Sequence, residues 1–418
     1  MDVKVVIGAN YGDEGKGLVT SLLTKQAQLK DNQVIVVLNN GGAQRGHTVV
    51  DKDIRHVFHH FGSGTLLGAD TFITENFVVN PMAFVNEYDE IRAKTDKDFN
   101  VFVDPDALVT TPFEMITNQI VSKCLDAQDS CGFGIWETVK PGNESHTVGW
   151  YRDAINNHME SDIIKYLKDK EYCLRLKVYE SVANKFSNYK AYITSKDMDD
   201  CINNYCKNIN FDGLIEHWIQ DLKNFFKLVF IPSSNKLLED YQTVIFENGQ
   251  GLLLDKNVDK EYGTPSYTGS EGAVRFIRQN HSFMHNINNI EFVYVSRTYI
   301  TRHGKGPMIG LPIWMPDEDK TNVYNEHQGR IRCSTLDIAK LFNRIYADIH
   351  IGRELSSEVA YKNICNRLFM THNDQDLLTM EMVHELTKYS KEAEYPTFKL
   401  SCVDETDDFS DPESLEYL

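Results

Sequence analysis

The segment VKVVIGANYGDEGKGLVTSLLTKQAQ, residues 3–28, joins an apolar run to a glycine-rich run and a helical pattern. The β-branched residues of Val3–Ile7 predict a buried strand, and Gly8–Gly17 predicts a loop. In Leu18–Gln28 the apolar residues recur every three or four positions, which predicts a helix. A strand followed by a glycine-rich loop and a helix is typical of an α/β fold with a large, mostly parallel central sheet and flanking helices.

Further apolar runs repeat this arrangement along the chain. Val34–Leu38 ends at two asparagines and two glycines, and the run 71–79 ends at an Asn-Pro pair. Sheet-like segments return at 243–246 and 290–295, and helical patterns return at 336–346 and 377–389. Since parallel sheets bind ligands at the carboxyl ends of their strands, we expect a P-loop-like nucleotide site at that edge.

The length of 418 residues suits two or three domains or one large α/β domain with insertions, and we interpret residues 1–418 as a single elaborated domain. Residues 150–230 contain little glycine and carry apolar residues at helical spacing, which predicts a helical insertion within that domain. Residues 404–418 hold seven acidic residues and no lysine or arginine, which is typical of a solvated acidic tail.

The composition restricts the class of partner. The net charge of −18 argues against binding of polymeric nucleic acid, and no apolar run approaches the length of a membrane span. The first residues do not resemble a signal peptide. None of the eight cysteines forms a C-x-x-C pair, which favours a reduced protein over a disulfide scaffold or a zinc site. We therefore expect a cytoplasmic protein with neither nucleic acid nor membrane as a partner.

The loop Gly8–Gly17 has the features of a phosphate-binding loop. Glycines let backbone N–H groups approach phosphate oxygens, the following helix adds its positive dipole, and Lys16 adds a full charge. Two positions depart from the Walker pattern: Asn10 stands where its first glycine would be, and Gly17 replaces the serine or threonine that binds Mg²⁺. A carboxylate among phosphate-binding amides is unfavourable unless it binds a metal or moves a proton, so Asp13 is predicted to be a metal ligand or a base.

Five motifs together carry a family resemblance. They are Gly12–Gly17, Gly46–Thr48, Phe246–Gly251 with the following Leu253–Asp255, Gly304–Pro307 and Gly329–Arg332. In this order they resemble the signatures of adenylosuccinate synthetases, over residues 8–337. That family joins L-aspartate to carbon 6 of IMP with GTP and Mg²⁺, and forms a homodimer whose site is completed across a two-fold interface.

The resemblance implies roles for individual residues. Asp13 would be the general base and a Mg²⁺ ligand, with the carbonyl of Gly46 as a second ligand. His47 would be the general acid beside the triphosphate, and Gln250 would contact the purine and stabilise its charge. The residues implied for the triphosphate are Gly12, Gly15, Lys16, Gly17, Gly46 and Thr48. Those implied for the purine nucleotide are Gln44, Ser130, Cys131, Leu254, Thr268 and His303. Those implied for aspartate are Gln328, Arg330 and Arg332, and Asp374 is implied for the base of the donor.

The sequence departs from the family pattern mainly in the nucleotide-binding segments. Gln44-Arg45 replaces Asn-Ala, Ser130–Gly134 replaces Thr-Thr-Gly-Arg-Gly, and His303 replaces an aliphatic residue. The arginine that the partner subunit normally supplies has no clear match, and Lys140 and Arg152 are the candidates.

The departures leave both nucleotides open. The lysine of the guanine-reading motif is lost at Thr371–Asp374, so the donor is GTP or ATP/dATP. IMP is the first acceptor by family, and dGMP, used by a phage-type branch that makes the 2-amino analogue, is the second. A nucleotide-binding regulatory module without ligase activity is the alternative of another class. Gln250 and the Arg330–Arg332 pair argue against it, because such a module needs neither.

Overall fold

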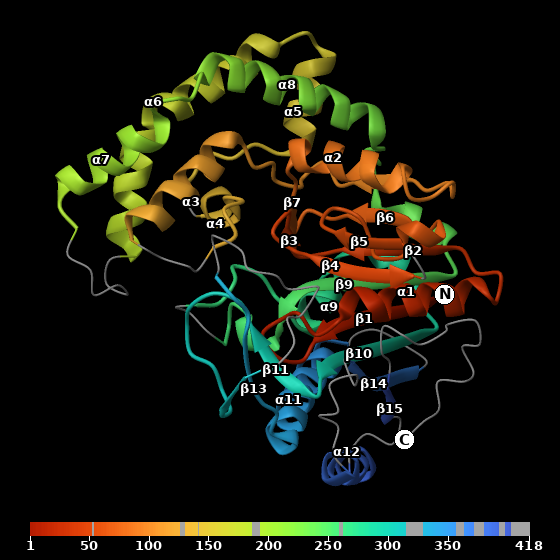
Figure 1. Ribbon diagram of the computed structural model, residues 1–418. Helices are drawn as coiled ribbons and strands as arrows, with labels where there is room; N and C mark the ends of the chain where they lie inside the picture. The colour runs from red at the N-terminus through yellow and green to blue at the C-terminus, as the bar shows by residue number, and fades with distance from the viewer. Residues whose placement is uncertain are drawn as a thin grey trace.

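The computed structural model describes residues 1–51, 54–125, 130–140, 142–185, 193–258, 262–314, 329–356, 363–371, 380–392 and 398–402. Within these residues the central element is an eight-stranded sheet with the order β15-β14-β10-β1-β9-β2-β6-β8, and every neighbouring pair is parallel (Figure 1). Its strands are β1 (Asp2–Gly8), β2 (Val34–Leu38), β6 (Asp70–Ile73), β8 (Val101–Val103), β9 (Thr243–Gly251), β10 (Asn289–Arg297), β14 (Asn363–Thr371) and β15 (Phe398–Cys402). The predicted α/β fold with a large parallel sheet is confirmed.

β1 lies in the middle of the sheet because it is apolar on both faces. Val5 and Ile7 belong to the core on one face, whereas Val6 belongs to the core on the other, and all three side chains are fully buried. Parallel pairing with β9 and β10 fixes the strand from both sides. The glycine-rich loop therefore starts from a rigid point in the centre of the molecule.

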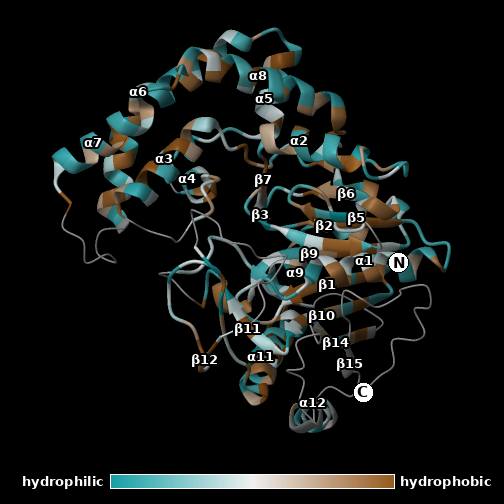
Figure 2. Ribbon diagram, viewed as in Figure 1, coloured by the Kyte–Doolittle hydropathy of each residue, from teal (hydrophilic) through white to brown (hydrophobic). Residues whose placement is uncertain are grey.

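Helices cover both faces of the sheet. One core includes residues of α1 (Lys16–Gln28), α2 (Pro81–Arg92) and α8 (Phe211–Leu228). The opposite core includes residues of α9 (Ser270–Gln279), α10 (His281–His285), α11 (Ile338–Ser356) and α12 (Met380–Glu392). Hydropathy follows this layering, since hydrophobic residues dominate the central strands in Figure 2.

Residues 148–228 are mainly helical where they are described. They form α5 (Val148–Asn156), α6 (Glu160–Lys185), α7 (Ser195–Cys206) and α8, which arch over α2 and α3 (Pro112–Cys124) in Figure 1. A separate apolar cluster joins α3, α6 and α7, with Ile120, Val178 and Ile202 as members. The acidic segment 404–418 lies outside the described residues. None of the described helices is long and apolar enough to cross a membrane.

Shorter strands surround the carboxyl edge of the sheet. β4 (His47–Asp51) and β5 (Ile54–Phe58) form a hairpin, and β3 (Gly41–Gly42) pairs with β7 (Phe77–Val78). A three-stranded sheet contains β11 (Tyr299–Arg302), β12 (Pro312–Ile313) and β13 (Arg332–Thr335). The short helix α4 (Ile135–Val139) follows the segment 130–134. Of these elements, β4 supplies His47, Thr48 and Val50 to the wall of the cavity beside the glycine-rich loop.

Candidate functional site

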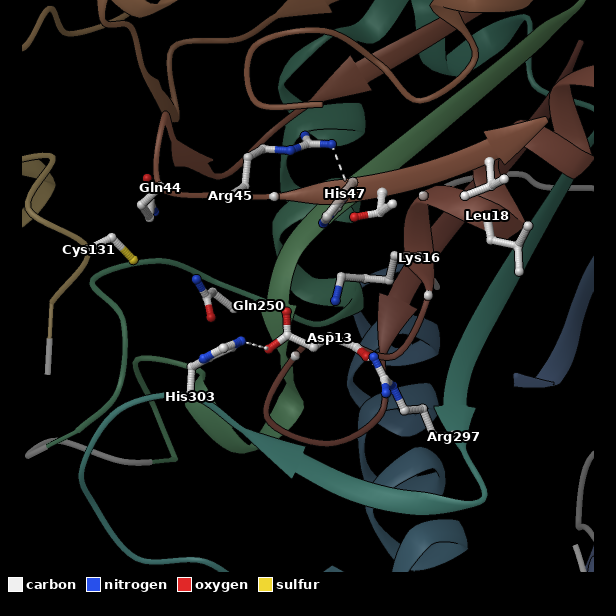
Figure 3. A pocket seen from close by; sticks show the side chains of 16 residues that line it. Asp13, Lys16, Leu18, Gln44, Arg45, His47, Cys131, Gln250, Arg297 and His303 are labelled. Carbon is white, nitrogen blue, oxygen red and sulfur yellow. Dashed lines mark hydrogen bonds and ion pairs between the residues drawn. The ribbon is translucent and has the colours of Figure 1, made fainter. Parts of the chain in front are cut away.

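A cavity of about 120 Å³ lies beside the loop between β1 and α1 (Figure 3). Its other walls come from residues 44–50, from Cys131, from Gln250 at the end of β9, and from Arg297 and His303 around β11. In Figure 3 the side chains come from segments far apart in the sequence and surround one space. The carboxyl ends of β1, β9 and β10 thus meet at a single site.

Most of the predicted site residues line this cavity. They are Gly12, Asp13, Gly15, Lys16, Gly17, Gln44, Gly46, His47, Thr48, Cys131, Gln250 and His303. Among the described residues, five predicted ones are not part of its lining: Ser130, Leu254, Thr268, Arg330 and Arg332. Gln328 and Asp374 lie outside the described residues.

Glu14 organises the glycine-rich loop from within. Its Oε1 accepts hydrogen bonds from the backbone N–H groups of Asn10, at 3.0 Å, and Gly12, at 2.8 Å. Its Oε2 lies 2.8 Å from Nζ of Lys16, and both side chains are buried. Because a buried lysine needs a counter-ion, Glu14 holds the ammonium in place beside the cavity. The sequence analysis missed this residue, although its position two residues before the loop lysine was visible.

Three side chains from other elements fix the backbone around Asp13. Arg297 donates to the Asp13 carbonyl, Thr301 donates to the Gly12 carbonyl at 3.0 Å, and Thr371 donates to the Glu14 carbonyl. The loop is therefore tied to β10, β11 and β14 at consecutive residues. This leaves the Asp13 carboxylate directed into the cavity (Figure 3).

Two residues of the cavity have an unusual backbone conformation. Asp13 has φ of 62° and Gln250 has φ of 63°, a left-handed region that non-glycine residues rarely adopt. Each such residue costs about 1–3 kcal/mol and persists where the surrounding structure enforces it. Gln250 lies within the register shift between β1 and β9, and its side-chain oxygen lies near Gly12 of the loop. Strain at both positions of one cavity is typical of a functional site.

His303 adds a second titratable group beside Asp13. Its Nε2 lies 3.8 Å from Oδ2 of Asp13, and it follows directly after β11. The imidazole thus stands next to the proposed base, where the family has an aliphatic side chain. The residue that departs from the family pattern thus lies inside the cavity, beside the Asp13 carboxylate.

His47 belongs to a buried charged cluster with Arg45, Glu247 and Ser63. Nδ1 of His47 lies 2.6 Å from Oε1 of Glu247 and 2.8 Å from Nη2 of Arg45, which in turn lies 2.9 Å from Oε2 of Glu247. Ser63 donates to Glu247 from its backbone N–H, at 3.0 Å, and from its hydroxyl. Nδ1 thus faces Glu247, which can only accept, and Arg45, which can only donate, so a given imidazole tautomer can hydrogen-bond only one of the two. With Nδ1 in this cluster, Nε2 is the nitrogen left for the cavity that His47 lines.

The charges in this cluster favour neutral histidine beside an ionised carboxylate. Burial, followed by the charge of Arg45, lowers the pKa of His47 to about 3 against the opposing effect of Glu247. Burial alone raises the pKa of Glu247, but the Arg45 charge and the hydrogen bonds from His47 and Ser63 outweigh it and lower the pKa. Sequence reasoning missed Glu247, which stands in the motif Phe246–Gly251 three residues before Gln250.

Gly17 allows α1 to approach β4 at this point. A Cβ atom on Gly17 would lie 2.9 Å from Cβ of His47 and 3.0 Å from Oγ of Ser63. Real Cβ atoms do not show such short contacts, so a larger residue would displace the histidine. The missing Walker hydroxyl therefore has a steric reason in this chain: the space is taken by His47 and its neighbours.

The thiol of Cys131 lies in the cavity as a neutral group. Burial, with a smaller contribution from the charge of Asp13, raises the pKa of Cys131 to about 12. A neutral thiol is a poor nucleophile, so this geometry favours a contact role over covalent catalysis. The neighbouring Ser130 hydroxyl points to α3 and donates to Oδ1 of Asn118 at 2.6 Å.

Of the arginines implied for aspartate, Arg332 lies against the loop 304–307. Arg332 donates to the carbonyls of Gly304, at 2.6 Å, and Gly306, at 3.0 Å, whereas Arg330 is exposed. Arg302 is buried and lies 4.5 Å from the ring centre of Tyr11. Arg332 thus shapes the loop in the structure, and its contact with aspartate stays a prediction.

Thr268 lies in the wall behind the cavity. It is fully buried, its hydroxyl donates to the Gly251 carbonyl at 2.9 Å, and its N–H donates to Asp255 Oδ2 at 2.7 Å. Leu254 is half-buried in the turn after β9. Thr268 thereby fixes the chain that leads away from Gln250, and its contact with a phosphate stays a prediction.

The residues of the cavity suit a hard divalent cation. The Asp13 carboxylate and the backbone of Gly46 line the same space, and Mg²⁺ prefers such oxygen ligands together with substrate phosphates. Among the described residues no three His, Cys, Asp or Glu side chains gather as a metal site. The donor set therefore fits a cation that is held jointly by the protein and a nucleotide.

Comparison with known proteins gives a consistent result. The family model of adenylosuccinate synthetase matches residues 5–311. The adenylosuccinate synthetase of Fusobacterium nucleatum is 28% identical over 309 residues, which cover 73% of this chain and 64% of that protein. The adenylosuccinate synthetase of Thermoplasma volcanium is 25% identical over 317 residues, which cover 72% of this chain and 62% of that protein. The chain thus matches less than two thirds of the length of these two relatives.

Two solved structures share the fold. Fully ligated adenylosuccinate synthetase from Plasmodium falciparum has a TM-score of 0.54 at 18% identity, over 89% of this chain and 77% of that one. Succinoaminodeoxyadenylate synthetase from cyanophage S-2L, bound to dGMP and to dATP as an energy donor, has a TM-score of 0.55 at 12% identity. The match covers 96% of this chain and 92% of the cyanophage chain.

Proposed function

Because the chain belongs to the adenylosuccinate synthetase family, we propose that it is a purine nucleotide–aspartate ligase. It transfers the γ-phosphoryl group of a nucleoside triphosphate to oxygen 6 of a 6-oxopurine nucleotide and then replaces that phosphate with the amine of L-aspartate. The observation that carries this proposal is the meeting of Asp13, Lys16, His47 and Gln250 at one cavity. A phosphate-binding loop alone needs neither the base nor the glutamine.

Asp13 starts the proposed reaction as the general base. Its carboxylate removes the proton from N1 of the purine, and the electron pair moves to oxygen 6, which attacks the γ-phosphorus. The bond from that phosphorus to the bridging oxygen breaks and leaves the nucleoside diphosphate. Gln250 lines the same cavity beside Gly12, which supports a role in which its amide hydrogen-bonds the anionic purine.

The triphosphate is proposed to bind between the loop and β4. The N–H groups around Gly15 and Gly17 and the ammonium of Lys16 contact its phosphates. His47 presents Nε2 to the same space while Glu247 holds its other nitrogen. The negative charge of a bound triphosphate favours the protonated imidazole, which is the form that a general acid needs.

Aspartate enters the second proposed step as the nucleophile. Its amine attacks carbon 6, and phosphate departs with the oxygen that had been oxygen 6. The amine loses a proton to the departing phosphate or to solvent, so the step balances without a further reactant. Arg330 and Arg332 are proposed to hold the two carboxylates of aspartate, since guanidinium groups bind carboxylates in a bidentate manner.

Asp13 and the Gly46 carbonyl are proposed to hold Mg²⁺ with the phosphates. The ion would neutralise charge on the transferred phosphoryl group. The donor is GTP or ATP/dATP. Asp374, proposed to read the donor base, lies outside the described residues. We also propose a homodimer, as the family resemblance implies, and neither Lys140 nor Arg152, the candidates for the residue from the partner subunit, lines the described cavity of the same chain.

IMP is the proposed acceptor by family, and one observation favours dGMP as the second candidate. Three residues that depart from the family pattern, Gln44, Cys131 and His303, line the cavity where the purine is proposed to bind. Changes on the acceptor side of a site alter the preferred purine more readily than the reaction. The cyanophage enzyme, which shares the fold, binds dGMP and uses dATP as its donor.

A substrate matrix tests the proposed function. IMP, GMP, dGMP and dIMP are each combined with GTP, ATP or dATP, with Mg²⁺ and with or without L-aspartate, and phosphate release is measured. We expect release only when acceptor, donor and aspartate are all present. Triphosphate binding without any aspartate-dependent release would instead support a nucleotide-binding regulatory module.

A further inference from the structure

We propose that Gln119 of α3 is a positioning residue that couples α7 to the purine loop, defined as residues 130–134. Its amide lies between the Tyr205 hydroxyl on α7 and the Gly132 carbonyl in the loop. The inference rests on the proposed function, because it assigns the loop to the acceptor nucleotide. It goes beyond that function by giving the outer helix α7 a role in acceptor binding.

Hydrogen bonds connect α7 to the loop in two steps. Nε2 of Gln119 donates to the carbonyl of Gly132 at 2.9 Å. Oε1 of the same amide accepts a hydrogen bond from the Tyr205 hydroxyl. Cys131, the neighbour of Gly132, lines the cavity. The Gln119 side chain thus connects Tyr205, which lies 86 positions further along the sequence, to the loop backbone beside the proposed acceptor.

Tyr205 holds the amide of Gln119 in the orientation that the loop needs. The Gly132 carbonyl can only accept, so it requires Nε2 of the amide to face it. A hydroxyl can donate or accept, and that of Tyr205 donates to the Oε1 left on the other side. Without it the amide gains freedom to rotate and the loop loses a fixed donor. The effect of Tyr205 on the loop therefore passes through Gln119.

The purine loop needs such external support because of its own composition. Gly132 and Gly134 have φ of 80° and 68°, so the loop depends on two left-handed glycines. Glycine leaves a chain with the greatest conformational freedom, and hydrogen bonds from outside restrict it. Near the two ends of the loop α3 supplies further contacts: Ser130 donates to Asn118 at 2.6 Å, and Gly134 approaches Glu114 so closely that a Cβ would lie 2.6 Å from its carbonyl carbon.

α7 provides a stable support for Tyr205. Ile202 on the same helix is buried in the cluster that joins α3 and α6, and Lys123 of α3 lies 4.9 Å from the centre of the Tyr205 ring. In Figure 1 α7 lies at the outer end of the helical layer, with α3 between it and the sheet. The path from α7 to the cavity therefore runs through α3 and its Gln119.

Enzyme kinetics on the full-length protein test this relay. For Tyr205→Phe and Gln119→Leu we expect the KM for the acceptor nucleotide to rise by about 5- to 20-fold, the size of effect that one or two hydrogen bonds produce. The KM for the triphosphate should stay within about twofold. The matched control is Tyr172→Phe on α6, a tyrosine that is 90% exposed, which should change neither KM.

A double-mutant cycle separates the relay from independent structural effects. If Tyr205 acts through Gln119, Tyr205→Phe has no further effect in the Gln119→Leu background. Effects on the acceptor KM that multiply in the double variant would overturn the relay. Equal rises in the KM for the acceptor and the KM for the triphosphate would also overturn it. Gln119→Glu supplies a conservative variant that keeps the acceptor for Tyr205 and loses the donor to Gly132, so it should resemble Gln119→Leu.

Hydrogen–deuterium exchange tests the inference even if the proposed function fails. We expect amide exchange of the peptide containing residues 130–134 to accelerate at least threefold in Tyr205→Phe, while peptides of β1 and β9 keep their rates. Unchanged exchange in the purine loop would refute the relay. Absence of any aspartate-dependent activity in the wild-type protein would refute the proposed function and leave this result interpretable.

Discussion

Nδ1 of His47 and Oε1 of Glu247 lie 2.6 Å apart, across 200 residues of sequence. This contact joins the hairpin of β4 to the strand that carries Gln250. It therefore connects the group proposed to meet the triphosphate with the strand proposed to meet the purine. The Arg45 guanidinium contacts both partners, and Ser63 completes the buried cluster through Glu247.

Removing Arg45 should destabilise the fold. Arg45→Met keeps the apolar volume but leaves the buried Glu247 carboxylate without its guanidinium, which costs about 3–5 kcal/mol for buried pairs of this kind. Urea unfolding at pH 7.5 measures the free energy of unfolding. Arg175→Met is the control, because the pair of Arg175 with Asp199 lies on the surface and should contribute little. Equal stability of both variants would contradict the assigned role of Arg45.

Asp13→Asn should strongly reduce turnover without unfolding the protein. Asparagine adopts left-handed backbone conformations readily, so φ of 62° is retained, but the amide cannot take a proton. We expect kcat to fall by about 10²- to 10⁴-fold, the usual contribution of a general base. Asp31→Asn, with φ of 57° on the surface, is the matched control and should keep full activity. A fully active Asp13→Asn enzyme would refute the assigned base.

Restoring the Walker hydroxyl at Gly17 should impair the enzyme. In Gly17→Ser the new Cβ would meet Cβ of His47 at 2.9 Å, so His47 or α1 must move. Overpacking of this kind costs about 1–3 kcal/mol, and we expect the midpoint of thermal unfolding to fall together with kcat. Gly142→Asn introduces a side chain where no heavy atom lies within 4 Å, and should leave both quantities unchanged. A more active Gly17→Ser variant would contradict the steric explanation.

The buried carboxylate of Asp348 predicts a dependence of stability on pH. Burial raises the pKa of Asp348 to about 6, although the Tyr294 hydroxyl and the N–H of Ser270 hydrogen-bond it. The folded state therefore binds this proton more tightly than the unfolded state, so the stabilisation is present below about pH 4 and is lost as pH rises through 6. Asp348→Asn should remove this component, which is on the order of 2 kcal/mol between pH 4 and pH 7.5.

Urea unfolding of wild-type protein and Asp348→Asn at both pH values measures this component. We expect the free energy of unfolding of the wild-type protein, minus that of Asp348→Asn, to fall as the pH rises. A difference that stays constant with pH would show that Asp348 does not titrate in this range. Asp337→Asn on the surface near the start of α11 is a control, because its pKa is lowered rather than raised.

Local patterns predicted the elements that begin the chain. The expected strand 3–7 and loop 8–17 correspond to β1 and to the segment before α1, and the expected run 34–38 coincides with β2. These elements form from local apolar spacing, which a sequence displays directly. The run 71–79 was expected as one segment, but a turn in which Phe77 donates to the Thr74 carbonyl divides it into β6 and β7. The polar residues Thr74, Glu75 and Asn76 in the middle of this run were the visible sign of the turn.

The arrangement of the site was predictable only where motifs carry it. Asp13, His47 and Gln250 lie in recognisable motifs, and the structure brings them to one cavity. Glu14 and Glu247 were not singled out, because a buried carboxylate has the same appearance in a sequence as an exposed one. Their partners are set by tertiary packing, as with Arg45 and Glu247, which are far apart in the chain and in contact in the fold.

An oxygen-18 transfer experiment tests the central claim most directly. The acceptor nucleotide is labelled with ¹⁸O at position 6, and the phosphate released in the presence of the triphosphate, Mg²⁺ and L-aspartate is analysed by mass spectrometry. If oxygen 6 is phosphorylated and then displaced by aspartate, each released phosphate carries one ¹⁸O atom from the acceptor. Unlabelled phosphate, with the label retained in the nucleotide, would contradict the ligase mechanism and indicate hydrolysis of the triphosphate by water.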